Sequence, residues 1–528
     1  MKLLSLTLFL TILFFNSCQK ETTETPESSA DERPNIVLIM VDDMGFSDLG
    51  IFGSRIQTPN IDQLANEGVL FSQFYNTSRC CPSRAALMTG LYQHQAGIGD
   101  MTGDHGYPSY QGRLNKSCVT IAEVLKDAGY STLMSGKWHL GSGKDYWPRQ
   151  RGFEQFYGVP EGGGVYFYPF NRKRSVVLND SVLALDETYY STTAFNENAV
   201  KFIDEAAKKD NPFFLYLAHI APHFPIQAPK EVYQKYLGKF MDGFDALKKE
   251  KLDQLKKLGF FGPQMQLSEV DDVVLNWDQL TQEEKEFYDH KMAIYAAQLE
   301  MVDHGVGEII KTLKANGALE NTAIFFLSDN GGTHEELGFD PLNIEDKDKL
   351  GSNETYRSYG RAWANVSNTP FRMYKHWVHE GGISSPLIFH YPNMKKADKL
   401  NHEVAHIMDI MPTCVELAET TYPDEYHGNK ILPMEGKSLL PLIKNGKRED
   451  HEALFWEHEG NKAVRVGDWK LVASFPEEVW RLYNVKEDRI EMKDLSSENP
   501  EKGKELTEKY EAWANRVGVV DRKLLVKK

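Results

Sequence analysis

Apolar residues gather in short continuous runs along the first two thirds of the chain. The runs at 35–40, 213–217 and 323–327 are typical of strands that are buried on both faces of a parallel sheet. Between them, apolar residues recur at helical spacing, most clearly over 193–208 and 288–315. Strands that alternate with helices predict an α/β fold with a mostly parallel central sheet.

The last part of the chain has a different pattern. After a loop at 444–450, apolar and polar residues alternate through ALFWEHE, KAVRVGDWKLVAS and EVWRLYNV, which predicts antiparallel strands. A helix is expected over 500–517. We therefore predict a main domain over 34–450 and a smaller C-terminal α+β subdomain over 451–528. A charged amphipathic helix at 238–259 is interpreted as a surface insertion.

The N-terminus carries a targeting signal. A positive residue, an apolar run at 3–15 and small or polar residues before Cys18 predict a signal peptide over 1–18 and export. Cys18 resembles the lipidated cysteine of bacterial lipoproteins, and the polar segment 19–33 would be a flexible tether. We expect a location in the periplasm or on the cell envelope, with a lipid anchor at the outer membrane. Ordinary cleavage with release into the periplasm is the alternative.

Composition narrows the class of partner. The chain has 528 residues, 41% of them hydrophobic, and a formal net charge of −16. No basic face is visible to neutralise phosphates, which argues against a nucleic-acid partner. Any affinity for an anion must come from a few cations in a cleft. Five cysteines, at positions 18, 80, 81, 118 and 414, are too few for a disulfide scaffold.

Polar side chains follow two of the predicted strands. Asp42 and Asp43 come after the first run, and Asp329 and Asn330 come after the run at 323–327. In parallel sheets, sites lie at the carboxyl ends of the strands. Oxygen ligands favour calcium or magnesium over zinc, so these four residues are candidate metal ligands. One such pair alone is equally well explained as a turn or a helix cap.

The segment CCPSRAALMTG, which begins at Cys80, resembles the signature of the type I, formylglycine-dependent sulfatases. That family belongs to the alkaline phosphatase-like superfamily, and the nearest likeness is to bacterial arylsulfatases. The resemblance implies that Cys80 is oxidised to formylglycine (3-oxoalanine) by a separate formylglycine-generating or sulfatase-maturing enzyme. Arg84 would hold the aldehyde hydrate and its metal ligands. The alternative is a pair of buried thiols at a helix start.

Three further segments resemble motifs of the same family: SGKWHLG, HIAPHFP and FRMYKHWVHEGG. By resemblance, Lys137, His223 and Lys375 bind the substrate, His139 serves the hydrate as base, and His223 with Lys375 assists the leaving group. The resemblance also implies one calcium ion held by Asp42, Asp43, Cys80, Asp329 and Asn330. The neighbouring histidines His219, His376 and His379 lack such support and are left out of the site.

The family implies a sulfuric ester hydrolase acting on aryl or carbohydrate sulfate esters, with sulfated polysaccharide as one expected substrate. Its fold is the alkaline phosphatase-like sandwich with a small C-terminal antiparallel sheet. Phosphonate and phosphodiester hydrolases of the superfamily are the nearest alternative, and a tethered binding protein without catalysis is another. Segments 238–286 and 333–358 depart from the family pattern. We expect them to rim the pocket and to set substrate choice.

Overall fold

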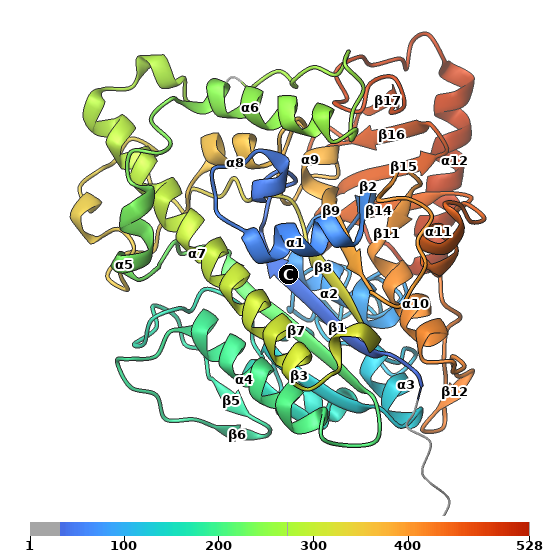
Figure 1. Ribbon diagram of the computed structural model, residues 1–528. Helices are drawn as coiled ribbons and strands as arrows, with labels where there is room; N and C mark the ends of the chain where they lie inside the picture. Colours follow the sequence, from blue (N-terminus) through green and yellow to red (C-terminus); the bar gives the residue numbers. More distant parts are fainter. Residues whose placement is uncertain (1–31, 272, 527–528) are drawn as a thin grey trace, which may run out of the picture.

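The computed structural model describes residues 32–271 and 273–526. Its centre is an 11-stranded sheet in the order β10-β2-β9-β8-β1-β7-β3-β4-β5-β6, with β11 beside β2 (Figure 1). The predicted signal peptide, Cys18 and the tether up to residue 31 lie outside the described residues. Every helix in the described part is too short or too polar to span a membrane.

The middle of the sheet is parallel, as the sequence predicts. β1 pairs in parallel with β7 and β8, and β3 pairs in parallel with β7 and β4. Towards the edges the sheet is mixed, because β9 runs antiparallel between β2 and β8 and β5 runs antiparallel to β4. The strands are β1 (Asn35–Asp42), β2 (Val69–Tyr75), β3 (Ser131–Lys137), β4 (Gln155–Val159), β5 (Val177–Leu178), β6 (Ser181–Val182), β7 (Phe213–Pro222), β8 (Thr322–Ser328), β9 (Ser384–His390), β10 (Leu400–Asn401) and β11 (Ala405–His406).

Helices cover both faces of this sheet. Successive side chains of a strand point to opposite faces, so Val37 and Ile39 of β1 pack in one hydrophobic core while Leu38 and Met40 pack in the other. Figure 1 shows α4 and α7 side by side across one face. The first core is covered by α1 (Pro59–Glu67), α4 (Ser191–Ala206) and α7 (Gln282–Ala315), and the second by α2 (Cys80–Thr89), α3 (Ile121–Asp127) and α10 (Ile410–Leu417).

The long helix α7 begins six residues before the predicted start at 288. The Thr281 side chain accepts a hydrogen bond from the backbone N–H of Glu284, and the Glu284 carboxylate reaches back to the N–H of Thr281. This capping box fixes the first turn. The predicted helix is too short at its N-terminus because the first turn is charged and lacks the apolar periodicity of the rest of the helix.

The charged helix α6 (Phe244–Lys257) is packed more deeply than a surface insertion. Lys251 is buried with its ammonium 2.9 Å from Asp48, and buried Lys248 donates a hydrogen bond of 2.6 Å to Asn365. Phe244 of the same helix lies in the first core. None of the residues of α6 hydrogen-bonds to a predicted site residue in the described part of the chain.

The C-terminal part forms a second, four-stranded antiparallel sheet, coloured red in Figure 1 together with α12 (Pro500–Val517). It shares a hydrophobic core with Tyr75, Tyr92 and Met408 of the main part. The boundary at residue 450 stays a prediction. The strands are β14 (Leu454–His458), β15 (Asn461–Val466), β16 (Trp469–Ala473) and β17 (Trp480–Asn484), and the remaining elements are α5 (Lys230–Tyr233), α8 (Arg361–Ser367), α9 (Glu380–Ile383), α11 (Leu440–Asn445), α13 (Arg522–Leu525), β12 (Glu425–Tyr426) and β13 (Asn429–Lys430).

Candidate active site

Four neighbouring parallel strands, in the order β8-β1-β7-β3, end at the same edge of the sheet. Each of them delivers a polar side chain there, which is where ligands bind in open α/β sheets. These side chains are Asp329 and Asn330 after β8, Asp42 and Asp43 at the end of β1, His223 after β7, and Lys137 at the end of β3.

The four predicted metal ligands form one buried cluster. The Asn330 amide donates a hydrogen bond of 2.7 Å to Asp43, and the backbone N–H of Asp43 donates one of 3.3 Å to the Asp329 carboxylate. Burial raises the pKa of Asp43 and raises that of Asp329 well above its ordinary value. Three carboxylates buried together require nearby positive charge.

The donor atoms of this cluster fit a hard divalent cation. Asp42 Oδ1 and Asn330 Oδ1 are buried and lack a hydrogen-bond partner in the described part of the chain. Such orphaned oxygens are costly unless they bind a donor or a metal ion. Ligand atoms of Asp42, Asp43 and His223 lie within 4.8 Å of one another. A set made mostly of carboxylate and amide oxygens matches calcium.

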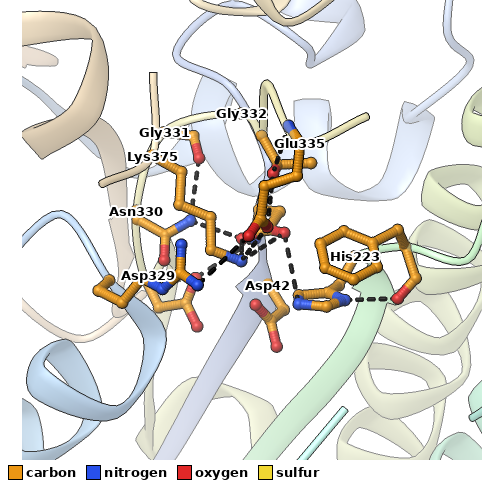
Figure 2. Close-up of polar contacts among 12 residues, drawn as sticks. Asp42, His223, Asp329, Asn330, Gly331, Gly332, Glu335 and Lys375 are labelled. Carbon is orange, nitrogen blue, oxygen red and sulfur yellow. Dashed lines mark hydrogen bonds and ion pairs between the residues drawn. The ribbon is translucent and has the colours of Figure 1, made fainter. Parts of the chain in front are cut away.

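Three buried cations surround the carboxylates. Arg84 Nη2 lies 3.0 Å from Asp329 Oδ2 and 3.3 Å from Asp42 Oδ2, and the Lys137 ammonium also pairs with Asp42. Lys375 lies 2.8 Å from the Asp43 carboxylate (Figure 2). Burial alone would lower the pKa of Lys375, but the neighbouring carboxylates raise it above its ordinary value. The three cations thus balance the three carboxylates, and a divalent cation bound among them would make this edge of an acidic protein positive.

Cys80 is the first residue of α2, and it is buried. The sulfur atoms of Cys80 and Cys81 and a ring nitrogen of His139 lie within 4.8 Å of one another. A hydrogen bond from Cys81, followed by the charge of Lys137, lowers the pKa of Cys80 well below its ordinary value. Cys80 was predicted among the metal ligands. The structure places its sulfur beside His139. A negative charge on this sulfur also acts on the carboxyl groups of Asp42 and Asp329.

His139 is held in a conformation that few side chains adopt. Its φ is 61°, in the left-handed region, and Gly162 lies so close that a Cβ there would be 2.9 Å from His139 Nε2. Burial, with Lys137 adding to it, lowers the pKa of His139 to about 4. The ring is therefore neutral at pH 7, and a neutral imidazole beside Cys80 can accept a proton.

His223 faces the cluster from the side opposite Asp329 and Asn330 (Figure 2). Its Nδ1 lies 2.5 Å from the carbonyl oxygen of Phe224, and its Nε2 lies 3.6 Å from Asp43 Oδ2. Since a carbonyl oxygen only accepts, Nδ1 carries the proton and Nε2 is directed to the site. Burial lowers the pKa of His223.

Two residues that the sequence analysis did not single out contact this site. Glu335 lies 3.7 Å from the Lys375 ammonium and 3.3 Å from Arg79 Nη2. Burial raises the pKa of Glu335, but Lys375 and then Arg79 outweigh it and lower the pKa to about 2. Because Arg79 directly precedes Cys80 in the sequence, its position near the site could have been predicted from the sequence. Through the contact of Glu335 with Lys375, segment 333–358 reaches the site.

Within the described residues, the side chains of the three histidines that were left out form no hydrogen bond or ion pair with the cluster. His219 and His379 are buried, and burial lowers the pKa of each. His376 instead pairs with Glu459, with its Nδ1 2.6 Å from the carboxylate. Lys375 and His376, although adjacent in sequence, thus take different partners.

Comparisons with known proteins agree with this geometry. A family model described as sulfatase matches residues 34–420, and one described as N-sulphoglucosamine sulphohydrolase, C-terminal, matches residues 371–515. An uncharacterized sulfatase of Schizosaccharomyces pombe is 35% identical over 94% of this chain and 96% of its own length. The arylsulfatase of Klebsiella aerogenes is 32% identical over 79% of this chain and 93% of its own.

A solved structure shares the fold. Ps i-CgsB in complex with k-i-k-neocarrahexaose is 28% identical, with a TM-score of 0.66 over 91% of this chain and 93% of that one. The likeness thus extends over about nine tenths of each chain. The mixed central sheet and the C-terminal antiparallel sheet therefore belong to a known architecture.

Proposed function

The chain belongs to the sulfatase family, and from that premise we propose that it hydrolyses aryl or carbohydrate sulfate esters through a formylglycine at position 80 and a calcium ion. The observation that carries the proposal is the meeting of Arg84, Lys137 and Lys375 with the carboxylates of Asp42 and Asp43 at one edge of the sheet. Fixed cations in a buried pocket stabilise the negative charge of a sulfate ester and of its transition state.

A formylglycine hydrate, when present, offers one hydroxyl to attack sulfur and a second whose deprotonation releases sulfate. The chain's own residues prepare that position. Position 80 begins α2, whose free backbone N–H groups favour an anion. Arg84, one turn further along α2, donates a hydrogen bond of 3.0 Å to the carbonyl oxygen of Lys137. This bond fixes the helix against β3, which carries the sulfate-binding lysine.

Neutral His139 is the group beside position 80 that can accept a proton. Calcium, when bound, would neutralise sulfate oxygens, and Asp42, Asp43, Asp329 and Asn330 would hold it. The orphaned oxygens of Asp42 and Asn330 support that ligand set. Any contribution of position 80 to the metal would come from the modified side chain.

Lys375 and His223 would serve the leaving group. Both lie against Asp43, and the raised pKa of Lys375 keeps its ammonium charged at neutral pH. His223 Nε2 lacks the proton in the neutral ring, so it must take one up before it can donate to a leaving oxygen. Lys137, paired with Asp42, and Lys375, paired with Asp43, would together hold the sulfate group.

Location and maturation are part of the proposal. The N-terminal pattern supports export to the periplasm or cell envelope, with Cys18 as the lipid attachment residue at the outer membrane. A separate formylglycine-generating enzyme would convert Cys80. Carbohydrate sulfates are supported as substrates by the neighbour that was solved with neocarrahexaose.

The test is hydrolysis by the mature chain from Glu21, produced together with a formylglycine-generating enzyme and supplied with calcium. We expect cleavage of 4-nitrophenyl sulfate that is lost in Cys80→Ala and after chelation. Cys118→Ala is the matched control, because Cys118 is also a buried cysteine but bonds to Asn115 away from the site. Dominant cleavage of a phosphate monoester or diester would overturn the sulfatase proposal.

A further inference from the structure

A basic loop runs beside the proposed sulfate-binding residues Lys137 and His223. The loop joins β4 to β5 and carries Arg172, Lys173 and Arg174 in succession. Arg172 and Lys173 are exposed and Arg174 is half-buried. In a chain with a net charge of −16, three consecutive cations are a local exception. The mechanism described above uses none of them.

The loop connects these cations directly to the sulfate-binding residues. A Cβ on Gly163 would lie 3.4 Å from Lys137 Nζ and 3.8 Å from His223 Nδ1. A Cβ on the next residue, Gly164, would lie 2.7 Å from the Tyr356 hydroxyl and 3.6 Å from Arg172 Cδ. Two adjacent glycines thus separate the pocket from Arg172. Their lack of side chains allows the loop backbone to lie this close to both groups.

The loop is held in place by hydrogen bonds and does not depend on Arg172 for its position. The Asn171 amide donates to the carbonyl oxygen of Asn353 at 2.6 Å, and Gln227 donates to Asn171 Oδ1 at 2.9 Å. The Tyr166 hydroxyl donates to the carbonyl oxygen of His223 at 2.7 Å. These bonds fix the loop to the segment that follows β7 and to segment 333–358.

The two arginines lack acidic partners in the described part of the chain. Arg172 contacts Tyr356, with its guanidinium carbon 4.9 Å from the ring centroid. Arg174 Nε is buried without a hydrogen-bond partner, and its Nη1 donates only to the carbonyl oxygen of Lys173 at 3.2 Å. By contrast, Arg149 before β4 pairs with Asp180 at 2.8 Å.

The β4–β5 loop carries one acidic residue, Glu161. Glu161 accepts a hydrogen bond of 3.4 Å from the backbone N–H of Ser175 and forms no ion pair with Arg172 or Arg174 within the described residues. Tyr356 adds a hydroxyl group beside Arg172. Planar guanidinium groups bind sulfate and carboxylate through paired hydrogen bonds.

We propose that Arg172 and Arg174, with Tyr356, form a second anion-binding subsite, so that the preferred substrate is a saccharide that carries another anionic group beside the sulfate ester being cleaved. The inference rests on the proposed sulfatase function and narrows its substrate class to polyanionic carbohydrate. The second group is a sulfate or a uronate carboxylate, because both offer the same pair of oxygens to a guanidinium.

The test compares substrates that differ only in the second anion. We would measure kcat/KM of the mature enzyme and of the Arg172→Ala/Arg174→Ala variant on a monosulfated disaccharide, its disulfated form and its uronate-containing monosulfated form. The variant should lose roughly 10-fold or more on at least one two-anion substrate. On the monosulfated disaccharide and on 4-nitrophenyl sulfate it should stay within about twofold. The sensitive substrate identifies the second anion as sulfate or carboxylate.

Two controls separate this inference from general effects. Arg481→Ala removes an exposed arginine of the C-terminal sheet that pairs with Glu477 and should change none of the four rates. Arg172→Lys/Arg174→Lys keeps the charge and should recover part of the loss. An equal loss on all substrates, or no loss on either two-anion substrate, would refute the subsite.

A binding measurement keeps the subsite testable if turnover fails. Calorimetric titration of Cys80→Ala with the two-anion disaccharides, with and without the two arginine substitutions, should show a roughly 10-fold weaker affinity without the arginines for at least one of them. Absence of turnover with confirmed formylglycine would refute the proposed function but not the subsite. Unchanged affinity for both disaccharides would refute the subsite but not the proposed function.

Discussion

Arg84 Nη2 lies 3.0 Å from Asp329 Oδ2, and both side chains are fully buried. Arg84 stands on α2 one turn after Cys80, whereas Asp329 follows β8. A second contact of the same nitrogen reaches Asp42 at the end of β1. The helix that carries Cys80 is therefore tied to two strand ends through one guanidinium group.

Arg84→Lys should lower kcat/KM on 4-nitrophenyl sulfate by about 100-fold or more. One ammonium cannot contact Asp42, Asp329 and the Lys137 carbonyl oxygen together, so position 80 loses its placement, and misplacement of about 1 Å can cost that much. Rates would be compared after peptide mass spectrometry has shown equal formylglycine content. Arg149→Lys, at an exposed ion pair, is the control. A rate within threefold of the parent would contradict this role.

Calcium should raise the melting temperature of the unmodified chain, because the ion binds the folded state through oxygens that otherwise lack partners. A ligand at 100 times its Kd stabilises by about 2.7 kcal/mol. Asn330→Ala removes one orphaned oxygen and should shrink the calcium-induced shift. Asn343→Ala, in an exposed loop, should leave it intact. Equal shifts in both variants, measured by differential scanning fluorimetry, would exclude Asn330 as a ligand.

Gly162→Ala should reduce turnover while the protein still folds. Gly162 has a φ of +139°, and a Cβ there would lie 2.9 Å from His139 Nε2, so the ring must move away from position 80. We expect kcat to fall at least about 10-fold. Gly238→Ala is the matched control, because its φ is also positive, at +81°, yet a Cβ there meets nothing within 4 Å. Similar activity in the two variants would show that His139 tolerates the displacement.

The C-terminal sheet is joined to the main domain by a buried charge network. Lys470 of β16 lies 2.9 Å from Glu380 of α9 and 2.8 Å from Glu491. Lys470→Met leaves two buried carboxylates without this partner and should lower the free energy of unfolding by about 3–5 kcal/mol. Lys486→Met, at an exposed pair with Asp468, should cost less than about 1 kcal/mol. Urea denaturation of both variants at pH 7 tests the difference.

The same network predicts a loss of stability in acid. Burial alone would raise the pKa of Glu380, but Lys470 and then Arg489 outweigh it and lower the pKa from 4.5 to about 2. A carboxyl group whose pKa is lower in the folded state than in the unfolded state stabilises the protein fully at pH values above its unfolded-state pKa. This stabilisation fades as the pH falls towards about 2, the folded-state pKa of Glu380. Between pH 6 and pH 3, wild type should lose about 2 kcal/mol more than Glu380→Gln. Parallel losses in the two proteins would rule out this contribution.

Much of the fold follows from local pattern. The apolar runs of β1, β7 and β8 and the periodicity of α4 and α12 are visible because strand and helix impose different spacings on apolar residues. The carboxyl-end rule then places Asp42, Asp43, Asp329 and Asn330 at one edge. The signature around Cys80 adds the nucleophile position by resemblance. Each of these inferences uses residues that are near neighbours in the chain.

Only the tertiary structure decided which distant residues meet. The strand order β8-β1-β7-β3, and the antiparallel insertion of β9, arise from pairing across up to several hundred residues, for which no local periodicity exists. Glu335 beside Lys375, and Arg172 beside Tyr356, are likewise contacts between loops that the sheet brings together. Composition and spacing therefore determined the elements and the polar residues at the strand ends, and the resemblance supplied the position of the nucleophile. The pairing of charges, and hence which cations stay free to bind substrate, depended on packing in three dimensions.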